Sequence, residues 1–301
     1  MPAGLGLMNT PSTWIAATYV ALLLSVLGLW IGRWVWITAL ALAVILGYVA
    51  QVLQGPAVIG IAAFAAVCIG FRHARASTSL RFRAVLMILS AAGIIVLGLL
   101  LAMHVAPGFH NFLVLDKVVL SPGAEPYTLY LNFDKTVVGI CLLGLCHPAL
   151  LTRTTEWRKA ARRGAPLALG NVMLVALVAL MLGYLAWQPK WTSLFWIWAP
   201  VNLFFVCLAE EAFFRGFIQR EIAAAFKGSR FGAVLAISVS AVLFGLAHFA
   251  GGVTYVVLAA IAGLGYAIVY QRTRSIEMAM LAHFALNTTH FVLFTYPSVR
   301  L

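Results

Sequence analysis

Apolar residues occur in long runs along the chain, and short polar stretches between the runs contain most of the charged residues. The runs are close to the roughly 17 to 25 residues that a helix needs to cross a bilayer. The pattern predicts an all-α protein, a polytopic transmembrane helical bundle with about ten spans. The predicted helices cover residues 13–31, 34–53, 56–72, 83–105, 136–152, 166–187, 191–213, 231–250, 253–271 and 275–295.

One stretch between the predicted helices is long enough to have structure of its own. Residues 106–135 contain prolines, glycines and two runs, VLDKVVL and YTLYLNF, in which apolar and polar residues alternate. Alternation of this kind is typical of strands joined by turns. We expect a small hairpin or lid outside the membrane here.

Composition and charge predict on which side of the membrane the loops and the termini lie. The chain has 301 residues, of which 63% are hydrophobic and 9% charged, which excludes a soluble globular protein. Most of its basic residues fall in alternate loops, as the positive-inside rule predicts for cytoplasmic loops, so both termini are expected outside. Loops that face anionic lipid explain the net charge of +12, and no nucleic-acid partner is expected. The basic residues on the other side are Lys117, Lys135, Lys190 and Arg300.

The stretch AEEAFFRGFIQRE places two adjacent carboxylates and an arginine at membrane depth. On a helix, Glu210 and Glu211 point about 100° apart, whereas Glu211 and Arg215 share one face and can form an ion pair. Glu210 has no evident partner nearby in the sequence. A carboxylate in such a poorly solvated site can act as a general acid or base. Alternatively, both glutamates only pair with arginines at a helix end.

Two further stretches carry histidines on predicted helices. In LFGLAHFAGG, Phe244 and His248 are four residues apart, as are His283 and Asn287 in HFALNTTH. An imidazole beside a carboxamide offers two donors for an oxyanion. A single histidine on an apolar helix is more often a packing residue. Together with Glu210, however, they predict one shared intramembrane site in a water-filled cavity.

In their order and separation, EEAFFR, FGLAH and HFALN fit the motifs EExxxR, FxxxH and HxxxN. Over roughly residues 191–295, the chain resembles the CPBP family of CAAX proteases and bacteriocin-processing enzymes, also called ABI or Rce1-like intramembrane proteases. We therefore expect an N-terminal transmembrane region of about five spans over 1–165, which includes the segment 106–135. A catalytic helical core is expected over 166–301.

The resemblance implies an intramembrane endopeptidase that hydrolyses peptide bonds of membrane-associated proteins or peptides. Glu210 with His248 would activate a water molecule, and His283 with Asn287 would stabilise the oxyanion. Structural support would come from Glu211, Arg215 and Phe244. The implied partners are a membrane-embedded or membrane-anchored substrate and the lipid bilayer. The expected location is the cell membrane, as a multi-pass protein of a bacterial inner membrane.

A zinc-dependent version of the same protease is an alternative, because Glu210, His248 and His283 form a possible zinc ligand set. The sequence lacks the H-E-x-x-H helix of many metalloproteases, so catalysis without a metal or other cofactor is preferred. Two non-proteolytic alternatives stay open, an immunity or scaffold protein and a transporter.

The rise per residue of a helix predicts the side of the membrane to which the cavity opens. Counted from the basic loops, Glu210 and His283 lie about 14 to 15 Å deep, nearer to these loops than to the opposite face. We therefore expect the cavity to open toward the cytoplasm, with the segment 106–135 taking no part in its mouth.

Overall fold

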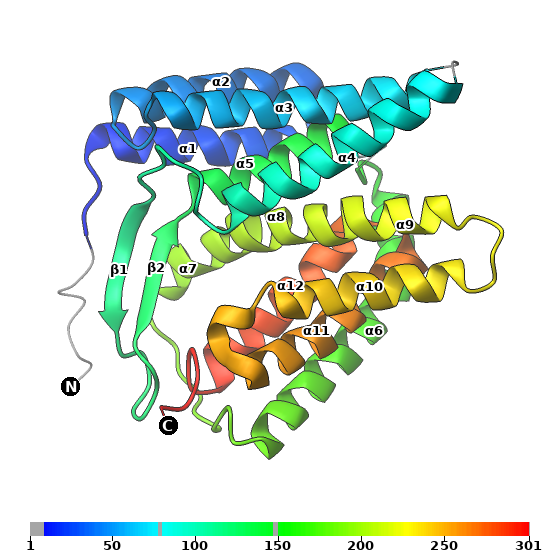
Figure 1. Cartoon of the computed structure of the whole chain (residues 1–301). Helices are drawn as coiled ribbons and strands as arrows, with labels where there is room; N and C mark the ends of the chain where they lie inside the picture. Colours follow the sequence, from blue (N-terminus) through cyan, green and yellow to red (C-terminus); the bar gives the residue numbers. More distant parts are fainter. Residues whose placement is uncertain (1–8, 78–79, 147–149, 301) are drawn as a thin grey trace.

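The computed structural model describes residues 9–77, 80–146 and 150–300, and most of these residues are helical (Figure 1). The first half contains α1 (Thr13–Gly28), α2 (Arg33–Val49), α3 (Gly55–Ala76), α4 (Leu80–Ala102) and α5 (Phe133–Cys141), which continues as a π-helical turn over Leu142–Cys146. The second half contains α6 (Thr154–Met181), α10 (Gly232–Leu246), α11 (Gly252–Thr273) and α12 (Ile276–Leu293). Helices therefore occur at each of the predicted runs.

One continuous helix, Phe195–Ala225, crosses the middle of the protein, and we name it the central helix. It consists of α7 (Phe195–Val201), α8 (Leu208–Glu211) and α9 (Arg220–Ala225), joined by π-helical segments at Asn202–Cys207 and Ala212–Gln219. Figure 1 shows α1, α2 and α3 on one side of this helix and α6, α10, α11 and α12 on the other.

Within the described residues, five helices are long and apolar enough to cross a membrane: Gly55–Ala76, Arg83–Ala102, Thr154–Met181, Phe195–Ala225 and Phe249–Thr273. Ten spans and the outside position of the termini are thus not confirmed. One face of α6 fits contact with lipid, because Leu169, Met173, Leu177 and Met181 recur every four residues and are 55–72% exposed. These features suggest a multi-pass membrane protein. The predicted division at residue 165 falls inside α6 and stays a prediction.

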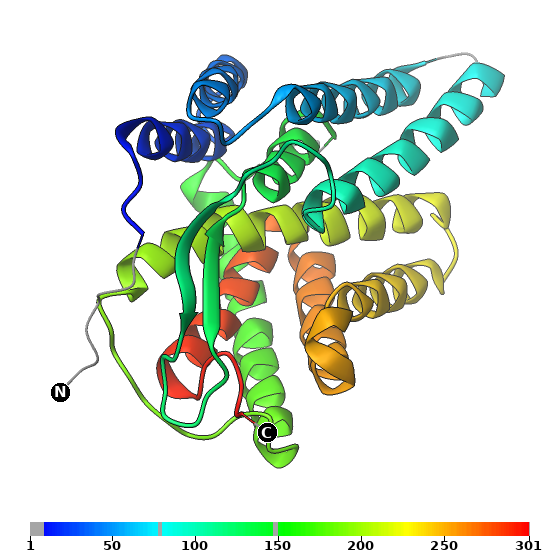
Figure 2. The same ribbon diagram turned by 60° about the vertical axis from the view of Figure 1, so that its left-hand side comes forward.

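The hairpin expected in the segment 106–135 is present. Strands β1 (Phe112–Val118) and β2 (Tyr127–Leu131) pair in antiparallel register, with Phe112 opposite Leu131 and Val118 opposite Tyr127. Figure 2 shows the hairpin running along the protein toward the C-terminus. Its turn pairs with the C-terminal tail, since Ala124 forms a bridge with Val299.

The position of α12 is fixed at its first turn. Ser275 caps the helix by accepting a hydrogen bond from the Met278 amide at 3.0 Å, and it donates to Glu277 at 2.8 Å. The buried Glu277 carboxylate also accepts hydrogen bonds from the Trp30 indole at 3.2 Å and the Leu151 amide at 2.5 Å. These contacts connect α12 to the first half of the chain.

A glycine allows α5 to approach the central helix closely. A Cβ atom at Gly139 would lie 2.3 Å from Leu208 Cδ2 and 2.9 Å from Ala209 Cα. Both distances are shorter than carbon atoms tolerate, so no larger residue fits unless the helices separate.

We expect Gly139→Ala to lower the free energy of unfolding by about 1–3 kcal/mol, because the added methyl group forces the two helices apart. Thermal unfolding in detergent micelles measures the effect. Gly170→Ala in α6 is the matched control, since a Cβ atom there meets nothing within 4 Å. Equal stability of the two variants would contradict the close approach.

Candidate active site

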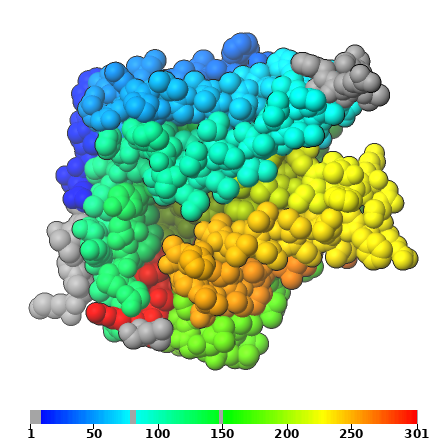
Figure 3. Space-filling model, viewed as in Figure 1, coloured from blue at the N-terminus to red at the C-terminus, as the bar shows by residue number. Residues whose placement is uncertain are grey.

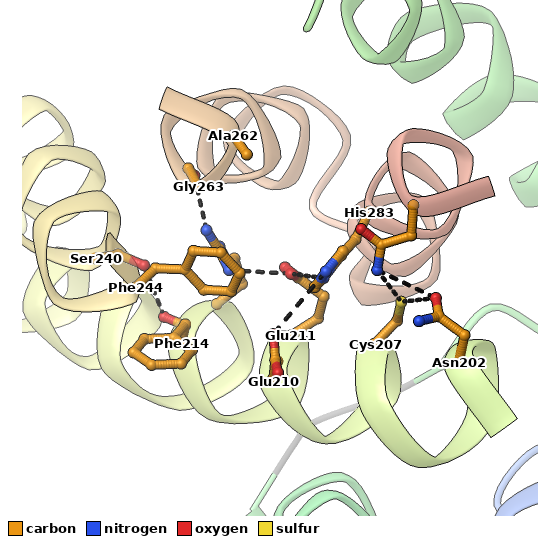
Figure 4. A network of polar contacts seen from close by, with 12 residues as sticks. Asn202, Cys207, Glu210, Glu211, Phe214, Ser240, Phe244, Ala262, Gly263 and His283 are labelled. Atoms are coloured by element: carbon orange, nitrogen blue, oxygen red, sulfur yellow. Dashed lines mark hydrogen bonds and ion pairs between the residues drawn. The ribbon is translucent and has the colours of Figure 1, made fainter. Parts of the chain in front are cut away.

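The central helix directs its two adjacent glutamates to different surroundings (Figure 4). The Glu211 side chain is fully buried, whereas that of Glu210 is 11% exposed. Both lie on the short segment Leu208–Glu211 between the two π-helical segments. π-Helical turns shift the angular position of the residues that follow them and are frequent at functional sites.

Glu211 and Arg215 form the predicted ion pair. Arg215 Nη1 lies 3.0 Å from Glu211 Oε1, and both side chains are completely buried. The second guanidinium nitrogen, Nη2, donates to the Gly263 carbonyl of α11 at 2.7 Å. The guanidinium also lies 4.5 Å from the centre of the Phe244 ring and 5.3 Å from that of Tyr266. Cation–π contacts of this kind favour a cation that has lost its water.

Glu211 also holds His283 of α12. The Nδ1 atom of His283 lies 2.9 Å from Glu211 Oε1, and the imidazole stacks on the Tyr266 ring with the centres 4.6 Å apart. Because the anionic carboxylate accepts this hydrogen bond, Nδ1 carries a proton. The other ring nitrogen, Nε2, then faces Glu210.

His248 lies beyond the end of α10 rather than on it. The helix ends at Leu246, and His248 follows in the turn before Gly252. Its Nδ1 atom lies 2.7 Å from the Phe244 carbonyl oxygen, which can only accept, so Nδ1 carries a proton here too. His248 is therefore held by its nearest helix, and its Nε2 atom points to Glu210.

Side chains from three other parts of the chain surround the Glu210 carboxylate. Its Oε2 atom lies 4.0 Å from His248 Nε2 and 3.9 Å from His283 Nε2. These distances exceed a hydrogen bond, and no donor among the described residues reaches Oε2. The other oxygen, Oε1, lies 2.5 Å from the ammonium group of Lys135. Glu210 thus has no partner nearby in the sequence, as expected, but α5 brings a cation to it from a distant part of the chain.

Asn287 lines the same cavity as His283, and its amide is already engaged. Its Nδ2 atom donates to Asn202 Oδ1 at 3.1 Å, and the Cys207 thiol donates to the same oxygen at 3.3 Å. The same Nδ2 atom lies 3.8 Å from the Cys207 sulfur, a weak acceptor, so both of its protons have partners in the structure. The structure thus brings together Glu210, His248, His283 and Asn287, the four residues expected to act in catalysis.

Sequence reasoning missed three residues of this neighbourhood, Lys135, Asn202 and Tyr266. Asn202 and Tyr266 lie in apolar runs without a recognisable motif. For Lys135 a signal existed, since it is one of the few basic residues outside the basic loops.

A cavity of about 540 Å³ contains the four residues, and its wall includes Glu125 and Tyr127 of the hairpin segment and Tyr296–Ser298 of the C-terminal tail. The expectation that the segment 106–135 stays away from the mouth is wrong. Helix rise alone does not show how a hairpin folds over the helix ends. The cavity reaches the exposed residues Ala250 and Gly251 at the start of α11, whereas the basic residues Arg272 and Arg274 lie at the other end of this helix.

Tyrosines surround this mouth. Burial raises the pKa of Tyr127 to about 12 and that of Tyr184 above its ordinary value. Burial likewise raises the pKa of Tyr296, well above the ordinary value. The three hydroxyl groups therefore stay neutral and can donate hydrogen bonds to a bound ligand.

A second, smaller cavity of about 160 Å³ reaches Glu210 from another direction. It lies between α4, which contributes Leu99 and Ala102, and the end of α10, where Ala247 and His248 follow. In Figure 3 the surface is hollowed between α4 and α10. Glu210 and His248 line both cavities.

The residues present fit a zinc ion poorly. Tetrahedral ligands at about 2.0–2.2 Å from zinc lie roughly 3.4 Å from one another, which is closer than Glu210 Oε2 lies to either imidazole. The Lys135 ammonium, 2.5 Å from the same carboxylate, would also repel a dication. The described residues contain no group of three or more His, Cys, Asp or Glu arranged to hold a metal ion.

Residues 191–289 match the family model described as Type II CAAX prenyl endopeptidase Rce1-like. The matched stretch contains the central helix, α10, α11 and most of α12. The chain therefore carries a domain of the Rce1-like CAAX protease family, which is a family of hydrolases, and the resemblance is confirmed. No curated protein and no solved structure matches the chain.

We expect Glu211→Gln or Arg215→Met alone to lower the free energy of unfolding by about 3–5 kcal/mol, because each leaves a buried charge unpaired. The double variant should be destabilised by less than the sum of the two, since it leaves neither charge behind. Unfolding in detergent micelles measures all three variants. Strictly additive losses would argue against the ion pair.

Proposed function

We propose that the protein is an intramembrane endopeptidase in which water activated by Glu210 and His248 hydrolyses a peptide bond. The observation that carries this proposal is the separation of about 4 Å between Glu210 Oε2 and the two imidazole Nε2 atoms. At this separation, a water molecule between the atoms can form hydrogen bonds both to the Glu210 carboxylate and to an imidazole.

Glu210 and His248 both offer a lone pair to such a water. In neutral His248, the Nδ1–H group donates its hydrogen bond to the Phe244 carbonyl oxygen. The Nε2 atom then carries a lone pair and can accept a hydrogen bond. The water can then donate one proton to Glu210 and the other to His248, which leaves its oxygen lone pairs for attack. A base positioned in this way typically contributes about 10²- to 10⁴-fold to the rate.

His283 and Asn287 would stabilise the tetrahedral intermediate. The water oxygen bonds to the scissile carbon, and the carbonyl oxygen becomes an oxyanion while Glu210 takes the proton. His283 can donate from Nε2 when it carries both ring protons, with Glu211 balancing the charge. Asn287 would donate the amide proton that now faces the weakly accepting Cys207 sulfur. The proton on Glu210 then passes to the leaving amine nitrogen as the C–N bond breaks.

The proposed substrates are proteins or peptides embedded in or anchored to the membrane. A cavity that reaches Glu210 between α4 and α10 would admit a chain from the bilayer. We place the protein in a bacterial inner membrane as a multi-pass protein of about ten spans. Residues 1–165 would be its N-terminal region and residues 166–301 its catalytic core. An immunity or scaffold protein and a transporter remain alternatives, and neither needs peptide hydrolysis.

We expect Glu210→Gln and His248→Ala each to lower cleavage by roughly 10²-fold or more, because the water loses a group that can take its proton. The assay uses fluorophore-labelled peptides that contain one membrane-spanning segment, with the purified protein in detergent micelles. Glu221→Gln, on the same helix but paired with Arg75, should keep its activity. Folded Glu210→Gln protein that cleaves as fast as the wild type would refute the proposal and favour a non-proteolytic role.

We further expect 1,10-phenanthroline to leave the cleavage rate unchanged and the purified protein to contain much less than one zinc ion per chain. The Lys135 ammonium next to Glu210 and the wide donor spacing are the physical reasons. Loss of activity that added Zn²⁺ restores would establish the zinc-dependent alternative.

A further inference from the structure

The ion pair between Lys135 and Glu210 joins the candidate site to a part of the chain that the family model does not cover. Lys135 is in the first turn of α5, and the match begins at residue 191. Its Nζ atom lies 2.5 Å from Glu210 Oε1, and the two side chains are only 16% and 11% exposed. An ion pair with so little water around it holds its members more firmly than one on the surface.

Polar contacts fix the start of α5 and with it the position of Lys135. The neighbouring Asp134 is fully buried and lies 2.9 Å from His104 Nδ1, and it accepts from the Asn111 amide at 3.0 Å. Asn111 in turn accepts from the backbone amide of Phe133 at 2.8 Å. The end of α4, the hairpin and α5 are thereby connected directly before Lys135.

Gly139 sets the distance between α5 and the catalytic carboxylate. It lies four residues after Lys135, on the same face of α5, and contacts Leu208 and Ala209 of the central helix. The close approach at Gly139 lets the Lys135 side chain span the remaining gap to Glu210.

We propose that Lys135 is a positioning residue for Glu210, and this inference rests on the function proposed above. A carboxylate has two oxygens, and only one can serve the activated water at a time. By holding Oε1, the ammonium group turns Oε2 toward the Nε2 atoms of His248 and His283. It also keeps the carboxylate ionised, which a base must be before it can accept a proton.

The same contact could have the opposite effect. A cation beside a carboxylate lowers its affinity for a proton, so the pair could also act as a latch that suppresses catalysis. The two roles predict opposite changes when the ammonium is removed. The orientation of Oε2 toward both imidazoles favours positioning.

The test compares Lys135→Met, which keeps most of the side-chain length, with Lys135→Arg, which keeps the charge. With the labelled membrane-spanning peptides as the probe, we expect Lys135→Met to lower kcat roughly 10- to 100-fold with KM nearly unchanged. Lys135→Arg should recover most of the activity. Lys117→Met on the hairpin is the matched control, because Lys117 is exposed, and it should behave as the wild type.

A second measurement does not depend on a substrate. Dicyclohexylcarbodiimide adds to protonated carboxyl groups in apolar surroundings, and mass spectrometry of the peptide that contains residue 210 reports the extent. We expect Lys135→Met to be labelled several-fold faster than the wild type in native membranes, because Glu210 loses the cation that keeps it ionised. The Glu210→Gln variant shows the background.

Unchanged or increased kcat in Lys135→Met would overturn the inference, as would unchanged labelling of Glu210. Loss of activity that Lys135→Arg does not recover, without faster labelling, would also overturn it, since only a structural role remains. If the wild type cleaves no membrane-spanning peptide while Lys135→Met is labelled faster, the proposed function fails and the ion pair is supported.

Discussion

The packing of the second half of the chain depends on one fully buried ion pair, Glu211 with Arg215. Two charges without water are costly unless every group around them is matched. Most groups of the pair are matched, since Arg215 contacts Glu211, a carbonyl of α11 and two aromatic faces, and Glu211 Oε1 also accepts from His283 of α12. Arg215 Nε and Glu211 Oε2 are buried without a hydrogen-bond partner among the described residues. The pair thereby determines how α10, α11 and α12 lie around the central helix.

This constraint also determines where Glu210 points. Because Glu211 must face the interior, its neighbour is rotated by about 100° toward the cavities. Glu210 thus stays 11% exposed while the adjacent carboxylate is sealed. The same network sets the orientation of His283, since a proton on Nδ1 is committed to Glu211 and only Nε2 can face Glu210. Two adjacent glutamates therefore have different surroundings: Glu211 forms the buried ion pair with Arg215, and Glu210 is the candidate reactive group.

The sequence predicted the parts of the site that depend on local spacing. The pairing of Glu211 with Arg215 follows from helical periodicity, and the hairpin follows from alternating residues with turn formers. Lys135 and Glu210 are 75 positions apart, so helical periodicity cannot predict their contact. The part of the hairpin segment in the cavity wall was predicted wrongly, because the rise along the helices of Glu210 and His283 does not show where a hairpin folds. In the structure α10 ends before His248, and the hairpin and the C-terminal tail form part of the wall.

The first half of the chain does more than anchor the Rce1-like domain. Its Trp30 contacts the Glu277 carboxylate at the start of α12, its Lys135 reaches Glu210, and its hairpin lines the larger cavity. Both cavities that reach Glu210 have walls that this half supplies, with Glu125 and Tyr127 in one and Leu99 and Ala102 in the other. Any molecule that approaches Glu210 through them therefore meets residues outside the family match. The matched residues carry the groups proposed for chemistry, whereas part of the wall of both cavities comes from residues outside the match.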